Sequence, residues 1–180
     1  MTVYASMLRG VNVAGKRMLK MSELAELYVS LGFDSVQTYL QSGNVIFSSN
    51  KGASLGLEEK VERGLKERFG FDAKVFIRTP GELGRVIREN PFVKKERTRL
   101  YVTFLHSKPS HVPLDKINAA RMGGEEFSVS GREVFLFLPN GSGKTKLSNA
   151  FFEKVLDVPA TTRNWNTVTS LAELAGHASG

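Results

Sequence analysis

Two stretches of this chain show the same order of hydrophobic patterns, and that repetition limits the possible folds more than any other property of the sequence. In residues 2–90 and again in 99–175 the order is strand, helix, strand, strand, helix, strand, helix. Apolar residues spaced three and four apart predict the helices, and short runs rich in β-branched and aromatic residues predict the strands. The first six elements of each stretch have the order of a ferredoxin-like unit. The sequence therefore predicts an α+β protein, a tandem duplication of two ferredoxin-like (βαββαβ) subdomains with antiparallel sheets, at 1–92 and 97–180.

The expected elements can be given bounds. Hairpins are predicted where turn residues interrupt strand-like runs, with turns at Ser42–Gly43 and Ser130–Gly131. Trp165, the only tryptophan, is expected to be an anchor in the core rather than a stacking surface. Helices are expected over 22–32, 55–70, 79–90, 113–122, 146–156 and 167–175, and strands or hairpins from residue 2 and over 35–49, 73–78, 99–106, 125–138 and 160–165.

Composition favours a soluble cytoplasmic protein. The 180 residues contain no cysteine, which excludes disulfides and thiolate metal sites. The chain does not start with the basic residues and apolar run that are typical of a signal peptide. No apolar stretch approaches the roughly 20 residues needed to cross a bilayer. We therefore expect no membrane partner, and the oligomeric state stays open.

The charge distribution indicates an anionic partner, such as nucleic acid or a nucleotide. The net charge is +7, and the positive charges are not spread evenly. Residues 1–22 contain four cations and no acid, and residues 134–152 contain Lys144 and Lys146 and no acid. The alternative is an ordinary basic protein whose charges serve solubility alone. The four cations of the first stretch are Arg9, Lys16, Arg17 and Lys20.

The stretch "LPNGSGKTKL" (138–147) resembles part of a P-loop, which has the pattern G-x-x-x-x-G-K-[ST]. Gly143, Lys144 and Thr145 match the end of that pattern, but Leu138 stands where its first glycine belongs. The preceding strand is predicted to be the second arm of a hairpin, whereas a P-loop follows a strand of a parallel sheet. We therefore predict that this stretch is not a P-loop. Two interpretations remain: a plain turn, or a glycine-rich turn that binds a phosphate at the start of the helix predicted from residue 146.

Four segments combine glycine with basic or amide side chains and are candidate ligand-binding loops. They are "LRGVNVAGK" (8–16), "LQSGN" (40–44), the "GSGKTK" stretch (141–146) and "TRNWNT" (162–167). Glycine permits positive φ and close approach of the backbone to a ligand. For each segment the alternative is a turn with a structural role only. The candidate ligand-binding residues are Arg9, Asn12, Lys16, Gln41, Ser42, Asn44, Gly143, Lys144, Thr145, Lys146, Arg163 and Asn164.

Common catalytic patterns are absent from the sequence. The three histidines lack metal-ligand spacing, no G-x-S-x-G occurs, and no carboxylate pair stands out, so we expect neither metal nor cofactor and assign no catalytic residue. RNA binding through stacked aromatic residues is also disfavoured, because "REVFLFL" (132–138) does not fit the pattern of RNA-recognition modules. Three hypotheses stay open: a protein that binds an anionic ligand, an enzyme acting on a phosphate-bearing substrate, and motifs that are purely structural in a protein with a protein partner.

The motifs, in their order, closely resemble a known family, Domain of Unknown Function 1697. The resemblance extends over nearly the whole chain, and it implies a bacterial protein with two ferredoxin-like subdomains and no established activity. Family members often carry Arg and Ser where Lys144 and Thr145 stand, which implies that the P-loop-like GKT is a local substitution. The matching segments are "LRGVNVAGK" (8–16), "MSEL" (21–24), "LGF" (31–33), "TYLQSGNVIF" (38–47), "RTPGEL" (78–83), "NPF" (90–92), "LPNGSGKTKL" (138–147) and "TTRNWNT" (161–167).

Overall fold

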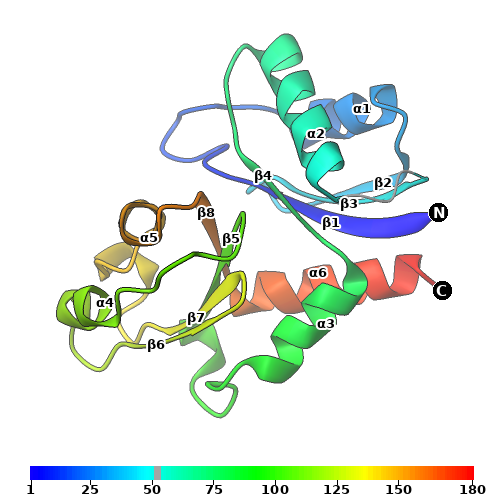
Figure 1. Cartoon of the computed structure of the whole chain (residues 1–180). Coiled ribbons are helices and arrows are strands. Elements are labelled where there is room, and N and C mark those ends of the chain that lie inside the picture. The colour runs from blue at the N-terminus through cyan, green and yellow to red at the C-terminus, as the bar shows by residue number, and fades with distance from the viewer. Residues whose placement is uncertain (51–53) are drawn as a thin grey trace. The chain divides into compact units, whose positions relative to one another are not determined.

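The computed structural model describes residues 1–50 and 54–180 and confirms the repeated order of elements (Figure 1). The first half contains β1 (Thr2–Leu8), α1 (Met21–Ser30), β2 (Asp34–Tyr39), β3 (Asn44–Ser49), α2 (Ser54–Phe69), β4 (Val75–Arg78) and α3 (Pro80–Glu89). The second contains β5 (Leu100–Leu105), α4 (Leu114–Ala120), β6 (Glu126–Ser130), β7 (Glu133–Phe137), α5 (Asn149–Leu156), β8 (Ala160–Asn164) and α6 (Trp165–Ala178). Short 3-10 turns lie at Arg97–Arg99 and Ser142–Lys144.

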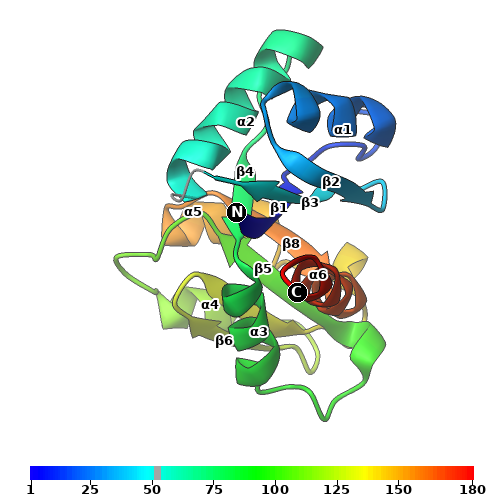
Figure 2. The same cartoon turned by 90° about the vertical axis from the view of Figure 1, so that its right-hand side faces the viewer.

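The first sheet has the strand order β2-β3-β1-β4, and every neighbouring pair is antiparallel. Helices α1 and α2 lie together on one face of this sheet (Figures 1 and 2). Tyr4, Phe47 and Ile77 contribute to a buried apolar cluster on that face, together with Tyr28 of α1 and Val61 of α2. The alternation of side chains along each strand therefore directs one set of apolar residues to the helices.

The second sheet has the equivalent order, β6-β7-β5-β8, and is also antiparallel throughout. Its core cluster joins Leu105 and Leu136 of the sheet to Ile117 of α4 and to Phe152 of α5. Within residues 1–50 and 54–180, two four-stranded sheets and six helices make this an α+β protein, consistent with duplicated ferredoxin-like halves.

Two buried arginines occupy equivalent positions in the two halves, and the sequence pattern did not predict this. Arg78 ends β4 and is paired with Ala5 of β1, and Arg163 of β8 is paired in the same way with Val102 of β5. Both side chains are buried, and the third helix of each half begins directly afterwards. Arginine at the end of a strand ordinarily indicates a solvent-exposed position, so the sequence pattern hides this repeat.

The chain forms two compact units whose bounds cross the two halves of the repeat. Unit 1 comprises Met1–Arg85 with Ser170–Gly180, and unit 2 comprises Val86–Thr169. The unit boundaries therefore fall within α3 and within α6. The subdomains at 1–92 and 97–180 rest on the order of elements, and that division stays a prediction.

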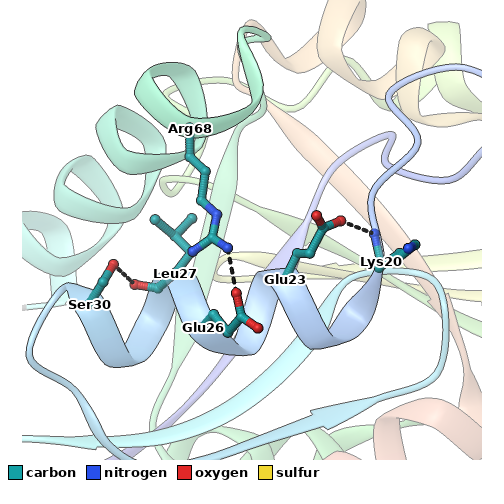
Figure 3. A network of polar contacts seen from close by, with 6 residues as sticks. All are labelled: Lys20, Glu23, Glu26, Leu27, Ser30 and Arg68. Carbon is teal, nitrogen blue, oxygen red and sulfur yellow. Dashed lines mark hydrogen bonds and ion pairs between the residues drawn. The ribbon is translucent and has the colours of Figure 1, made fainter.

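Helix α1 is fixed at both ends and to its neighbour α2 (Figure 3). At its start the backbone N–H of Lys20 donates to the Glu23 carboxylate at 3.4 Å, and at its end the Ser30 hydroxyl donates to a backbone carbonyl. Between them, the Arg68 guanidinium of α2 pairs with Glu26 at 2.6 Å. The β1–α1 loop, which contains one of the candidate segments, therefore ends at a well-defined point.

Several predicted boundaries were wrong; the last helix, expected over 167–175, spans Trp165–Ala178. Helix α5 begins at Asn149, not at 146, because the Ser148 side chain accepts the backbone N–H of Phe151 and caps the helix there. The first hairpin has a four-residue connection over 40–43 rather than a tight turn at Ser42–Gly43. Trp165 is buried, as expected. The helices in the described part of the chain are each too short or too polar to cross a membrane.

Candidate functional site

The loop between β1 and α1, residues 9–20, contains a miniature hairpin; we call it the Asn12 loop (blue in Figure 1). Val13 and Lys16 form an isolated β-bridge, and the N–H of Lys16 donates to the Val13 carbonyl at 3.0 Å. The two residues between them, Ala14 and Gly15, both have positive φ, as in a type I′ turn. The segment is therefore an ordered turn rather than an irregular connection.

Asn12 joins this loop to the β2–β3 hairpin. Its Nδ2 donates to the Gln41 carbonyl at 2.8 Å, and its Oδ1 accepts the N–H of Leu19 at 2.8 Å. The residue itself has a φ of 53°, a region that asparagine tolerates better than most residues. One amide side chain therefore fixes both the exit of the loop and its distance from the hairpin.

Close backbone packing explains the glycine of "QSGN". Gly43 has a φ of +79°, and its carbonyl accepts the N–H of Leu8 at 2.9 Å. A Cβ on Gly43 would lie 2.5 Å from Cγ2 of Val11 and 3.0 Å from Cβ of Leu8. Only glycine fits between these two buried side chains, so the hairpin can approach the Asn12 loop closely.

Cations and apolar side chains are exposed together around Asn12. Lys16 and Arg17 are exposed, and neither forms an ion pair in the part of the chain that the structure describes. Three large apolar side chains that flank the Asn12 contacts are also exposed: Val13 by 58%, Met18 by 64% and Leu40 by 52%. This surface therefore offers positive charge beside apolar groups.

The predicted residues of unit 1 lie close together but differ in what they do. Asn44 is buried, and its amide donates to the Tyr39 carbonyl and to the Ser42 hydroxyl, so both Asn44 and Ser42 hold the hairpin. Lys16 and the Gln41 side chain are exposed, and Arg9 is half-buried. Arg17 was not among the predicted site residues. The charge pattern had marked it, and the structure adds that its guanidinium lies near Gly10, 3.2 Å from where a Cβ would stand.

The "GSGKTK" stretch lies in unit 2 and lacks the helix that an anion site there requires. Because α5 begins only at Asn149, the 141–146 turn is not at a helix N-terminus, and that argument for phosphate binding was wrong. The Thr145 hydroxyl accepts the N–H of Leu147 at 2.9 Å, which is a turn contact. The preceding strand β7 is the second arm of an antiparallel hairpin, so the surroundings differ from those of a P-loop. Gly143, Lys144 and Lys146 are exposed.

Arg163 and Asn164 are engaged by the fold of unit 2. Nη1 of Arg163 donates to the Thr161 hydroxyl at 2.9 Å, and burial lowers the pKa of this guanidinium to about 10. Oδ1 of Asn164 accepts the N–H of Thr167 at 2.8 Å and caps α6. These contacts give both residues structural roles.

Three further residues lie at the same end of the second sheet and were missed by the sequence analysis. The Arg97 guanidinium donates to Asn166 and Thr169, each at 2.7 Å. A Cβ on Gly141 would lie 3.5 Å from Nη1 of Arg99 and 4.0 Å from the Tyr101 hydroxyl. No local pattern in the sequence links Arg97 to Asn166, which lies 69 positions further along the chain.

Acidic and histidine side chains do not form a metal site within residues 1–50 and 54–180, where groups of three or more are absent.

Comparison with known proteins places the chain in a family. The family described as "protein of unknown function (DUF1697)" matches residues 1–135. The chain belongs to this family. Among solved structures, the conserved bacterial protein SP0830 from Streptococcus pneumoniae is similar with a TM-score of 0.71 and 23% identity, over 97% of this chain and 98% of that chain. That likeness concerns the fold. A search of curated proteins found no match.

The DUF1697 match covers the Asn12 loop and the β2–β3 hairpin but ends before two of the motifs. The "LPNGSGKTKL" and "TTRNWNT" segments, at 138–147 and 161–167, lie outside the matched residues. The family match therefore includes every motif of unit 1, together with "NPF" (90–92) of unit 2.

Proposed function

We propose that this chain binds an anionic ligand, a nucleic acid or a phosphorylated small molecule, at the Asn12 loop. The observation that carries the proposal is the pair of exposed cations, Lys16 and Arg17, in an acid-free segment. The +7 charge of the chain adds a long-range attraction for anions.

The surrounding contacts favour a binding surface over a merely solvated loop. The turn at Ala14–Gly15, the two Asn12 hydrogen bonds and the packing of Gly43 all hold the loop before a ligand arrives. A loop that is already ordered loses less conformational entropy on binding, so more of its contact energy appears as affinity.

A panel of ligands tests this proposal by thermal shift. The panel contains nucleotides, sugar phosphates and short RNA and DNA strands, each at low and at higher salt. Binding to the folded state raises Tm by mass action, so we expect at least one phosphate-bearing class to raise it. A shift that is confined to oligonucleotides and disappears with salt would indicate contacts to the phosphate backbone. If no anion raises Tm, the proposal is wrong.

The enzyme alternative has a separate readout. Turnover of a phosphate ester or nucleotide that Lys144→Ala abolishes would support catalysis in unit 2. Binding without turnover would support the proposal as stated.

A second candidate function, recognition of a protein partner, is favoured by the exposed apolar side chains Val13, Met18 and Leu40. Apolar groups that cluster on a surface are typical of protein interfaces. Val13→Ser with Met18→Ser would then abolish a protein interaction and leave phosphate-ligand shifts unchanged. Loss of the phosphate-ligand shift in that variant would contradict this second function.

A further inference from the structure

Unit 2 contains a cavity that none of the motifs explains. It lies between the end of the β6–β7 hairpin and the segment 106–113, which joins β5 to α4, together with the first residue of α4. Its volume is about 340 Å³. This volume lies at the small end of the range of ligand pockets, which is about 300–1,000 Å³. The residues that line it are Lys108, Pro109, Val112, Leu114, Val129 and Gly131.

Backbone hydrogen bonds hold the segments next to the cavity. The N–H of Leu105, at the end of β5, donates to the Arg132 carbonyl of the hairpin turn at 2.8 Å. The next N–H, that of His106, donates to the Pro159 carbonyl at 2.9 Å. At the other end of the segment, the N–H of Leu114 donates to the Val112 carbonyl at 2.9 Å. The cavity is therefore formed without a ligand.

The cavity has an apolar floor and an open side. Val112 and Val129 are partly buried and pack against the core of unit 2, so they supply the floor. Leu114 is 54% exposed although it begins a helix over the core. A Cβ on Gly131 would meet no atom within 4 Å, so the turn leaves space at the rim. A ligand with an apolar part would cover side chains that water now reaches.

One cation stands among these apolar residues. Lys108 is exposed, is the only charged residue of the lining, and forms no ion pair within the described residues. The other lining side chains have no hydrogen-bond donor, so a multiply charged phosphate would lack partners here. A single carboxylate matches a single ammonium group.

We propose that this cavity binds a small amphipathic carboxylate, with its apolar part on Val112 and Val129 and its carboxylate beside Lys108. This site belongs to unit 2 and is independent of the anionic ligand proposed for the Asn12 loop of unit 1.

Isothermal titration calorimetry with octanoate tests the site in the full chain. Octan-1-ol and octylammonium serve as probes with the same chain and a different head group. We expect saturable binding of octanoate at one site, weaker binding of octanol, and the weakest binding of octylammonium. Equal affinity for the three probes, absence of saturation, or binding at several sites at high concentration only would overturn the proposal.

Variants locate the binding. Leu114→Trp fills the cavity from an exposed position and should abolish octanoate binding, and Leu114→Phe is a smaller replacement if that protein does not fold. Lys108→Ala should weaken octanoate binding about two- to five-fold, the effect of a partly exposed ion pair, and leave octanol unchanged. Lys16→Ala with Arg17→Ala should bind octanoate like the wild type. Unchanged binding in a folded Leu114 variant, or an equal effect of Lys108→Ala on all probes, would contradict the assignment.

Discussion

Gly43→Ala tests whether the approach of the hairpin to the Asn12 loop depends on a missing side chain. A new Cβ would lie 2.5 Å from Cγ2 of Val11 and 3.0 Å from Cβ of Leu8, and both neighbours are buried. The positive φ alone costs roughly 1–2 kcal/mol for a residue with a Cβ. Overpacking adds typically about 1–3 kcal/mol. We therefore expect Gly43→Ala to lower the free energy of unfolding by about 2–5 kcal/mol.

Gly15→Ala is the matched control. Gly15 has a φ of +71°, close to that of Gly43, but a Cβ there would meet nothing within 4 Å. Both substitutions share the backbone penalty and the reduced entropy of the unfolded chain. Urea unfolding of both variants therefore isolates the steric contribution, which we expect to be about 1–3 kcal/mol. Equal destabilisation by the two substitutions would refute the packing argument.

Three further predictions concern single side chains. Asn12→Ala removes both hydrogen bonds that join the loop to its neighbours, and urea unfolding should show a loss of about 1–3 kcal/mol in the free energy of unfolding. An unchanged free energy would mean that these two hydrogen bonds do not hold the loop in place. Asn164→Ala removes the α6 cap and should lower the free energy of unfolding by about 1 kcal/mol, while the rise in Tm caused by a ligand stays unchanged. A smaller ligand-induced rise in Tm would give Asn164 a binding role. Burial raises the pKa of Tyr28, whose hydroxyl forms a hydrogen bond with Ser6 at 2.6 Å. The contribution of the neutral phenol to the free energy of unfolding is therefore complete below the unfolded pKa of about 10, and it falls as the pH rises above that value. Tm measured from pH 8 to 11 should therefore fall more for the wild type than for Tyr28→Phe, and parallel curves would contradict the burial argument.

Local patterns carried most of the information about the fold. The strand and helix order of both halves followed from hydrophobic spacing, because each element has one face directed to its own core. The predicted start of α5, at residue 146, was three residues too early, because apolar spacing predicts that a helix exists more reliably than where it begins. Ser148, an ordinary N-cap residue, was the signal that fixes the start at Asn149.

The contacts that hold the candidate site together could not be predicted from local sequence patterns. The sequence marked the Asn12 loop as a glycine- and cation-rich segment, and its binding role stays a prediction; the turn at Ala14–Gly15 lacks the usual Asn-Gly signal of a hairpin. Arg97 reaches Asn166, 69 positions further along the chain, and no local pattern predicts such a pair.

The most direct test of the binding surface is the affinity of the phosphate-bearing ligand that gives the largest thermal shift. It is measured for the wild type, for Lys16→Ala with Arg17→Ala, and for Lys116→Ala with Lys154→Ala, which removes two exposed cations of unit 2 instead. Both variants lose the same net charge, so they differ only in where it is removed. We expect the Kd to be at least about tenfold weaker for the Asn12-loop variant, equivalent to about 1.4 kcal/mol, and less than about twofold weaker for the control. Equal weakening in the two variants would show that net charge, and not the Asn12 loop, attracts the ligand.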